Sequence, residues 1–375
     1  MTEPLSTQPF LRCIDDVTYP TKIQKSQFLP TGKFPIISQE ENFINGYWND
    51  EAALFRVKRP VVVFGDHTKV VKYIDFDFVL GADGVKVLQP KTFLEPRFFY
   101  YWLKSLTLDS LGYARHYKLL KEQSVPLPHL SEQQRIVGIL DVALESIAIA
   151  RANTSKIIES LRNLFESYAY AVFSEGREPR VSRRLKDVCE TITDGTHQTP
   201  TYSNSGFIFL SSRNVVSGTI NWNNVKYIDA AQHAAMQKRV SPRLNDILLA
   251  KNGTTGVAAL VDRGEPFDIY VSLALLRPKD TVLPRFLLHF VNSPVAKDQF
   301  NKRLKGSGVP NLHLEEIREV ELSLPDALSD QSSIVEQLDR LSFETTVAIN
   351  LAQRKLAALE ELQQSLLQAA FRGGM

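Results

Sequence analysis

The sequence predicts an α+β fold: two β-rich domains separated by a long antiparallel two-helix coiled coil, with a pseudo-two-fold internal repeat. Three observations predict it. A stretch near the middle of the chain recurs at its end without a gap. Each copy carries apolar residues at the three- and four-residue spacing of an amphipathic helix. Outside these copies, β-branched and aromatic runs alternate with glycine- and aspartate-containing turns, as in strands and hairpins.

The repeat consists of residues 130–176 and 328–374, which match at a constant offset of 198 positions. Of the 47 aligned positions 14 are identical, and both copies open with similar residues, Leu130-Ser131-Glu132-Gln133 and Leu328-Ser329-Asp330-Gln331. A gap-free register of this length is what a rigid helix imposes, because one inserted residue rotates everything after it by about 100°. The duplication therefore divides the protein into two half-molecules.

Composition sets bounds on the class of protein. A chain of 375 residues can form two or three domains, and 43% hydrophobic and 23% charged residues are ordinary for a globular protein. The formal net charge of +2 neither demands nor excludes a nucleic-acid partner, since a basic face can lie within a balanced total. Cys13 and Cys189 lie far apart and form no metal-type spacing. With a polar N-terminus and no run of 18 apolar residues, we expect a soluble, cytoplasmic protein with no membrane partner.

Residues 1–129 are predicted to form the first β-rich domain. A short helix is expected after Pro96, and Pro126 and Pro128 end the domain because proline continues neither a strand ladder nor a helix interior. Turn signals such as Gly65-Asp66 separate the strands. The predicted strands lie within Ala53–Val57, Pro60–Phe64, Val70–Ile74 and Gly84–Leu88.

Residues 130–176 are predicted to form the first long helix, with Ser131 as its N-cap. From Ser131 to Phe173 this helix would be roughly 65 Å long at 1.5 Å per residue. Its apolar stripe is interrupted once, near Thr154. A helix this long with one apolar stripe is not stable alone in water and requires a partner. The core positions that we assign to it are Ile136, Leu140, Leu144 and Leu161.

The second half repeats this plan, with a β-rich domain at residues 177–327 and a second long helix at residues 328–375. Strands are predicted within Phe207–Leu210, Asp246–Ala250 and Val257–Val261, and a helix after Pro284. Because only about ten residues join the first helix to this domain, the two helices must run antiparallel for their stripes to pair. The core positions of the second helix are Ile334, Leu338, Leu359 and Leu362.

The sequence contains no catalytic signature that we recognise. It has no glycine-rich cofactor fingerprint, and Gly32-Lys33 lacks the rest of a phosphate-binding loop. No cluster of His, Cys and Asp has the spacing of metal ligands. We therefore expect a protein that is not an enzyme and that binds neither a metal nor a cofactor.

Several polar loops combine glycine with hydrogen-bond donors and are suited to nucleic acid. Gly65–Lys69 and Lys251–Gly256 each follow a predicted strand; glycine permits close backbone approach, and Lys, Thr and Asn bind phosphates or base edges. Basic segments at Arg115–Lys118 and Lys302–Ser307 occupy the same place in each half, which favours a phosphate-binding role. On composition alone, hairpin turns with solvated polar side chains explain the glycine-containing loops equally well. The candidate DNA-binding residues are His67, Thr68, Lys69, Arg115, His116, Lys118, Thr196, His197, Arg213, Asn214, Lys251, Asn252, Thr254, Lys305, Ser307 and Asn311.

Together these features resemble the specificity subunit of type I restriction–modification systems, over nearly the whole chain. One departure is that Val125-Pro126-Leu127-Pro128 is one residue out of register with Leu322-Ser323-Leu324-Pro325, so the two domain–helix junctions are not identical. The resemblance is carried by the paired helix entries at Leu130 and Leu328, by Phe64-Gly65-Asp66-His67-Thr68 with Gly81-Ala82-Asp83-Gly84, by Thr193-Asp194-Gly195-Thr196-His197, and by Gly306-Ser307 with Pro310-Asn311-Leu312.

The resemblance implies a non-catalytic subunit that reads DNA. Each β-rich domain would be a target recognition domain that reads one half of an asymmetric bipartite site in double-stranded DNA. The helix pair would set the spacer between the half-sites and dock two methyltransferase (modification) subunits, which the restriction (motor-nuclease) subunit then joins. S-adenosylmethionine, ATP and Mg²⁺ would belong to those partners, so no cofactor is expected on this chain.

Two other classes of protein stay open on the sequence. The first is a stand-alone bivalent DNA-binding regulator; a charged outer face on the helices would favour it, and exposed apolar residues there would favour protein partners instead. The second is a coiled-coil scaffold whose β domains bind carbohydrate or protein. A DNA-binding shift assay would separate this scaffold from the other two.

Overall fold

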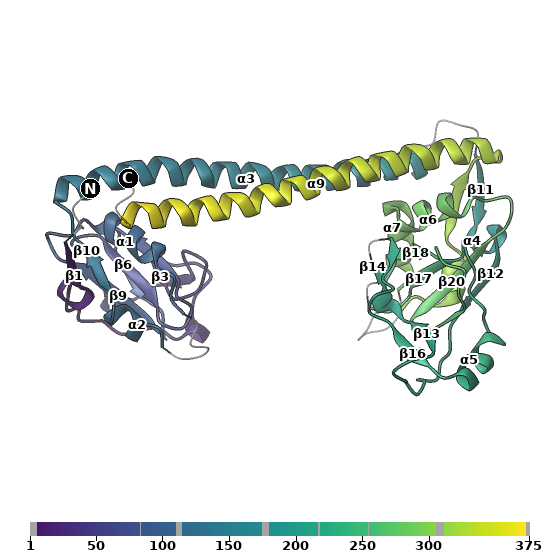
Figure 1. The fold of residues 1–375 in the computed structure, drawn as a ribbon, viewed down its shortest axis with the longest axis horizontal. Helices are drawn as coiled ribbons and strands as arrows, with labels where there is room; N and C mark the ends of the chain where they lie inside the picture. Colours follow the sequence, from purple (N-terminus) through teal and green to yellow (C-terminus); the bar gives the residue numbers. More distant parts are fainter. Residues whose placement is uncertain are drawn as a thin grey trace. The chain divides into compact units, whose positions relative to one another are not determined.

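The computed structural model describes residues 6–82, 84–109, 115–174, 180–216, 218–253, 255–304 and 311–372. The chain divides into two compact units, Met1–Ser155 with Gln353–Met375 (unit 1) and Lys156–Ala352 (unit 2). Each unit contains one β-rich domain and part of both long helices (Figure 1). The predicted α+β class, with two β-rich domains, two long helices and an internal repeat, is confirmed. Among the described residues, no helix is both long enough and apolar enough to cross a membrane.

The β-rich domain of unit 1 contains two four-stranded sheets, ordered β2-β9-β6-β7 and β4-β3-β8-β5, and the two-stranded sheet β1-β10. Strand β6 is buried along its whole length, as its run of valines predicts. It pairs antiparallel with both β7 and β9. The strands are β1 Thr7–Pro9, β2 Ile14–Asp15, β3 Phe34–Ile37, β4 Gly46–Trp48, β5 Leu54–Phe55, β6 Val61–Gly65, β7 Val71–Ile74, β8 Phe78–Leu80, β9 Val85–Pro90 and β10 Ser124–Pro126. The helices are α1 Pro96–Ser105 and α2 Tyr117–Lys121, with 3₁₀ turns at Phe10–Arg12, Lys25–Gln27 and Glu51–Ala53.

Helix α1 lies at the centre of the unit 1 core. It begins at Pro96, with the Glu95 side chain accepting a hydrogen bond from the third helical N–H group, as expected for a helix with proline at its first position. Phe99 stacks on Phe10 with ring centroids 6.1 Å apart. On the other side, Phe98 contacts Phe371 of the C-terminal helix at 5.0 Å between ring centroids. The core of this domain therefore includes the ends of the long helices.

Unit 2 repeats this topology. Its sheets are ordered β12-β20-β17-β18, β16-β13-β19, β11-β21 and β14-β15. Its strands are β11 Val181–Arg184, β12 Cys189–Asp194, β13 Phe207–Leu210, β14 Val215–Val216, β15 Thr219–Ile220, β16 Lys226–Ile228, β17 Ile247–Ala250, β18 Ala258–Leu260, β19 Phe267–Ile269, β20 Leu273–Pro278 and β21 Glu321–Leu324. Its helices are α4 Leu185–Val188, α5 Ala230–Gln237, α6 Pro284–Asn292, α7 Pro294–Arg303 and α8 Leu314–Arg318, with a 3₁₀ turn at Ser212–Asn214.

The two β-rich domains share most of their elements, although β5 has no counterpart in unit 2 and β14, β15, α5 and α7 have none in unit 1. In both, an antiparallel four-stranded sheet accompanies a second sheet with one parallel pair, β3 with β8 and β13 with β19. Helix α6 is the counterpart of α1, and both begin at the expected proline. Helix α8 is the counterpart of α2. The repeat that the helices reveal in sequence therefore extends through the domains.

The two long helices are α3 (Leu130–Ser174) and α9 (Leu328–Phe371), and they pair antiparallel in each unit (Figure 1). In unit 1 Arg151 forms an ion pair with Glu360 at 2.7 Å. In unit 2 the Tyr168 hydroxyl donates to the side chain of Gln337 at 2.7 Å. The contacts divide both helices between the units, whereas the sequence predicts domain boundaries at the helix ends.

The inward faces of these helices largely match the predicted stripes. Ile136, Leu140, Ile334 and Leu338 are buried, and Leu144, Leu161 and Leu359 are half-buried. Thr154 fills the predicted interruption: it is buried, and its hydroxyl donates to the carbonyl of Ala150 at 2.7 Å, so no polar group is left unsatisfied.

Two sequence predictions about the long helices are wrong. Leu362 is 47% exposed, because the next residue, Gln363, continues the inward face and accepts a hydrogen bond from Arg151. Ser131 is not the N-cap, because α3 already begins at Leu130. The strand predicted within Ala53–Val57 is confirmed but short, at Leu54–Phe55, because Asp50 caps a 3₁₀ turn that precedes it.

A buried glutamine joins each domain to its long helix. In unit 1 the Gln133 amide donates to the carbonyls of Phe93 and Pro128, both at 3.0 Å, and its oxygen accepts from the N–H of Glu95 at 2.8 Å. In unit 2 Gln331 makes the same three bonds, to Thr281, Pro325 and Leu283. Both glutamines are almost fully buried. The repeated Leu-Ser-acid-Gln motif therefore positions the loop before α1 or α6.

An aspartate two turns further along each helix makes a second junction. Asp141 pairs with Arg97 at 2.7 Å and accepts the Tyr101 hydroxyl, both on α1. Asp339 pairs with Arg285 and with His289, each at 2.7 Å, both on α6. Burial, together with the hydrogen bond to Asp141, raises the pKa of Tyr101. Burial also lowers the pKa of His289, against the opposing effect of Asp339.

We predict that Gln133→Ala lowers the free energy of unfolding by about 2 kcal/mol or more, because it leaves buried backbone groups without partners. Gln134→Ala is the matched control, since Gln134 is the exposed next residue of the same helix turn. Urea unfolding of the full chain, followed by circular dichroism, measures both. Equal midpoints for the two variants would show that the glutamine junction contributes nothing.

Candidate nucleic-acid interface

In the first domain, the structure brings together two of the predicted segments, the turn after β6 and the segment before α2. The backbone carbonyl of Asp66 accepts from the N–H of His116 at 2.8 Å, and its carboxylate accepts from the N–H of Tyr117 at 2.7 Å. The turn is tight, because Lys69 has a φ of 61° and a Cβ on Gly65 would lie 2.3 Å from the Thr68 hydroxyl oxygen. Residues 66–69 and 115–118 therefore lie at one edge of the domain.

A cation-lined concavity of about 340 Å³ lies at this edge. Its one carboxylate, Asp66, is buried and already accepts the backbone N–H of Tyr117, and three cationic side chains outnumber it, so the concavity has a net positive lining that suits phosphate. The Nδ1 atom of His67 has no hydrogen-bond partner within the described part of the chain. The lining residues are Lys22, Asp66, His67, Gly84, Val85, Lys86 and Arg115.

Gln39 holds the turn in place. Its side-chain oxygen accepts from the N–H of His67 at 3.1 Å, and its backbone carbonyl accepts the Thr68 hydroxyl at 2.6 Å. The loop that carries it is anchored in turn by the buried Lys72, whose ammonium donates to oxygens of residues 42–45. Burial lowers the pKa of Lys72 to about 8, against the opposing effect of nearby Glu40. The conformation of residues 66–69 therefore depends on the loop that carries Gln39.

In the second domain, three segments meet at Asp194. One carboxylate oxygen accepts from the Lys251 ammonium at 2.7 Å; the other accepts from Arg239 at 2.7 Å and lies 3.2 Å from Nε2 of His197. Burial alone raises the pKa of Asp194, but hydrogen bonds from Lys251 and Arg239 outweigh it and hold that pKa below its usual value. The carboxylate is therefore an ionised centre around which basic side chains are arranged.

The same backbone bond ties the site together in both domains. The carbonyl of Lys251 accepts from the N–H of Leu312 at 3.1 Å, just as that of Asp66 accepts from His116. Asn252 and Asn311 extend this contact as an isolated β-bridge. In each domain the loop after the central strand is thus tied to the segment leading into the short helix. The counterpart of Arg115–Lys118 in this contact is the segment before α8. The prediction that Lys302–Ser307 occupies the same place is therefore wrong: Lys302 and Arg303 lie on α7, and residues 305–310 lie outside the described residues.

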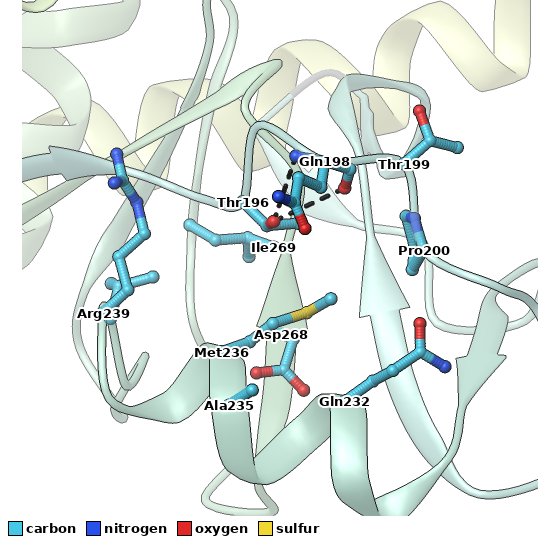
Figure 2. A pocket seen from close by; sticks show the side chains of 11 residues that line it. Thr196, Gln198, Thr199, Pro200, Gln232, Ala235, Met236, Arg239, Asp268 and Ile269 are labelled. Carbon is cyan, nitrogen blue, oxygen red and sulfur yellow. Dashed lines mark hydrogen bonds between the residues drawn. The ribbon is translucent and has the colours of Figure 1, made fainter.

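Two further concavities border the loops of the second domain. One, of about 530 Å³, brings Arg213 and Asn252 together with Gly253. The other, of about 280 Å³, lies between the loop after β12 and helix α5. Figure 2 shows Thr196, Gln198 and Thr199 on one wall and Gln232 and Met236 on the other.

The structure corrects the placement of three predicted DNA-binding residues. His116, Asn214 and Lys251 are buried, with polar atoms bonded inside their domains. Because their side chains are not at the surface, they position the loops and do not present free groups. Thr254, Lys305 and Ser307 lie outside the described residues. The other candidates are wholly or partly exposed at the domain surface, and their contact with DNA stays a prediction. They are His67, Thr68, Lys69, Arg115, Lys118, Thr196, His197, Arg213, Asn252 and Asn311.

Comparison with known proteins shows the family. The sequence profile described as "Type I restriction modification DNA specificity domain" matches residues 12–160 and again residues 178–361. The chain belongs to this family. The two matches contain one β-rich domain each, together with much of the long helix that follows it.

Curated relatives and solved structures agree with this. The chain is 20% identical over 356 residues to the type I restriction enzyme EcoR124I/EcoR124II specificity subunit of Escherichia coli, covering 86% of this chain and 83% of that protein. It is 23% identical over 415 aligned residues to the EcoKI specificity subunit of Escherichia coli strain K12, covering 99% and 88%. A chain from a structural study of the assembly and conformational transition of the type I R-M system superposes with a TM-score of 0.74 at 18% identity, covering 100% and 99%. The HsdS subunit from Thermoanaerobacter tengcongensis gives a TM-score of 0.56 at 17% identity, covering 100% and 98%, and both structures share the fold.

Several residues of the candidate interface of this chain are not predicted from the sequence. Lys22, Gln39, Lys86 and Arg239 lie outside the glycine-containing loops that the sequence singles out. Their places depend on long-range contacts between segments, which no local pattern shows. Lys86 alone had a signal, since it alternates with buried valines on strand β9 and must face away from the core.

Gly195 allows the loop after β12 to lie close to the end of strand β19. A Cβ at this position would lie 1.9 Å from the carbonyl oxygen of Ile269, which also accepts a hydrogen bond from the N–H of Thr196 at 3.0 Å. Only glycine allows the two backbones to come this close. The neighbouring Asp194 is thereby held within reach of Lys251 and Arg239.

We predict that Gly195→Ala lowers the free energy of unfolding by about 1–3 kcal/mol, because the added methyl group forces the backbones apart. Gly264→Ala is the control, since a Cβ there would meet no atom within 4 Å. Thermal unfolding of the two variants and of the unaltered chain gives the comparison. If both variants melt alike, the close approach at Gly195 is not a constraint.

Proposed function

We propose that this chain is the specificity subunit of a type I restriction–modification system and that its two β-rich domains each read one half of a bipartite site in double-stranded DNA. The observation that carries this proposal is the duplication within a family of DNA specificity domains. Each domain ties the loop after its central strand to the segment before its short helix α2 or α8 by a similar backbone bond. A chain with two such edges suits a DNA site with two separate halves.

The chemistry of the loops supports contact with both backbone and bases. Lys86 and Arg115 line the concavity of the first domain, and Arg213 lines one in the second. Basic groups of this kind bind phosphates, whereas Asn, Gln and Thr side chains in the same loops can discriminate base edges. In this proposal the chain supplies recognition and no catalytic group, and S-adenosylmethionine, ATP and Mg²⁺ bind to its partner subunits.

Outer stripes of exposed apolar residues on the long helices support protein partners. In unit 2 Phe343, Val347 and Leu351 recur every four residues on one face of α9, with exposures of 70%, 51% and 66%. In unit 1 Ile139, Val142 and Ile149 form a similar exposed stripe on α3. Ile149 and Val347 are equivalent positions of the repeat. The other positions of the two stripes are not equivalent, but each half of the chain presents one exposed apolar face around this shared position. We propose that these faces dock two methyltransferase subunits, which a restriction subunit joins.

These stripes disfavour the stand-alone regulator. A helix pair that only separated two DNA-binding domains would expose charged and polar side chains, because exposed Phe and Leu are unfavourable in water. Family membership disfavours the carbohydrate- or protein-binding scaffold. The expected partners are therefore DNA and the subunits of the same system.

We predict that co-expression of this chain with its methyltransferase modifies a bipartite site, and that shortening the helices changes only its spacer. Removing four facing residues from both α3 and α9 shortens the pair by about 6 Å and should shift the spacer by about two base pairs. Selection on randomised DNA with the purified complex measures the half-sites and the spacer. An unaltered spacer would contradict the role of the helices, and a complex without sequence preference would contradict the proposed function.

We predict that Val347→Asp lowers methyltransferase binding at least about tenfold, because it places a charge in the middle of an apolar contact. Thr346→Asp is the matched control: it introduces the same residue one position earlier, about 100° around the helix and away from the stripe. Co-purification and calorimetric titration measure the effect, and circular dichroism verifies the helix content. Equal losses in the two variants would mean that the stripe is not the docking surface.

A further inference from the structure

Arg239 is held in one orientation at the C-terminal end of helix α5. Its Nε atom donates to the backbone carbonyl of Asp194 at 3.3 Å, and one terminal nitrogen donates to the Asp194 carboxylate at 2.7 Å. Its side chain is nevertheless 48% exposed. The guanidinium is therefore fixed on one side and open to solvent on the other.

The charge of Arg239 is not cancelled by the carboxylate that holds it. Asp194 is also paired with Lys251, whose side chain is 7% exposed, at 2.7 Å. Among Asp194, Arg239 and Lys251 alone, one carboxylate and two cations leave a net charge of +1, before any charge on His197 is counted; the Asp268 carboxylate in the same concavity is bonded to His233 and Gln237 instead. Because Lys251 is buried and cannot reach a ligand, the excess charge is presented by Arg239. The buried lysine thus lets Asp194 orient the arginine without neutralising it.

The open side of the guanidinium has the geometry of a fork. Asp194 occupies the edge formed by Nε and one terminal nitrogen, so the two terminal nitrogens still point one N–H each in parallel directions. Within the described part of the chain, the other terminal nitrogen makes no hydrogen bond. A fork of two parallel donors matches O6 and N7 of guanine in the major groove, which a lysine cannot imitate.

The surroundings favour a base over a phosphate. Arg239 lines the same concavity as Thr196, Gln198 and Thr199, whose neutral hydroxyl and amide groups suit base edges (Figure 2). Asp268 also lines it, and its carboxylate, bonded to His233 and Gln237, repels a phosphate. A phosphate contact, moreover, does not require the orientation that Asp194 imposes.

The geometry points to Arg239 as the residue that reads a guanine in the half-site bound by the second domain, with Asp194 and Lys251 as positioning residues. This inference rests on the proposed function and goes beyond it by naming one residue and one base. Thr196 and Gln198 lie beside it and would contact the neighbouring base pair.

The test is selection on randomised double-stranded DNA, with the full chain purified in complex with its methyltransferase partner. For Arg239→Gln we expect the preference for guanine at one position of the second half-site to fall at least about fivefold, with the first half-site and the spacer unchanged. Arg239→Lys should lose the same preference while keeping the positive charge. Lys238→Gln is the matched control, because it removes a positive charge from the adjacent exposed residue and leaves Asp194 untouched.

Each contrary outcome has a distinct meaning. A uniform loss of affinity with the same consensus, and a salt dependence reduced by about one ion, would overturn the base assignment and show a phosphate contact. An unaltered consensus and affinity would overturn any contact by Arg239. If the unaltered complex selects no sequence at all, the proposed function itself fails, and this inference with it. Thermal unfolding midpoints verify that each variant is folded.

Discussion

The structure depends on the way each β-rich domain is fixed to the long helices by buried polar groups. Gln133 and Gln331 each satisfy three backbone groups of their domain, and Asp141 and Asp339 each bind an arginine from the preceding domain helix, α1 or α6. A buried amide satisfied on all sides is costly to displace, since removing it leaves its partners unpaired. These contacts let the apolar core of each domain continue into the helix ends.

The candidate interface is built on the same principle, with buried polar side chains arranging exposed ones. Asp66 ties the turn after β6 to the segment before α2. Asp194 orients Arg239, and Lys251 balances the negative charge of Asp194. The residues that hold these loops are therefore constrained, whereas the exposed side chains beside them are free to differ. If the exposed side chains contact DNA as proposed, this division would let the fold stay constant while the base recognised changes.

The helices and their pairing could be predicted because they depend on periodicity and on a gap-free repeat, which are local properties of the sequence. The sequence does not predict which of Leu362 and Gln363 faces the partner helix, because a small rotation of α9 exchanges the two neighbouring positions. The loops were located correctly from glycine and turn chemistry. Which of their side chains reach the surface was not predictable, because the burial of His116 and Lys251 depends on carboxylates and carbonyls far away in sequence.

The two halves differ where the repeat is least constrained. Where an aspartate of each long helix contacts the domain, Tyr101 of α1 and His289 of α6 occupy equivalent positions: Tyr101 contacts Asp141, and His289 contacts Asp339. Both donate one hydrogen bond to the carboxylate, so either residue satisfies the junction. The recognition loops differ far more, with Asp66 in one domain where Lys251 stands in the other, although the backbone bond at that position is kept. Backbone geometry is thus the feature that the two halves share, and side-chain chemistry is where they differ, as the proposed reading of two different half-sites requires.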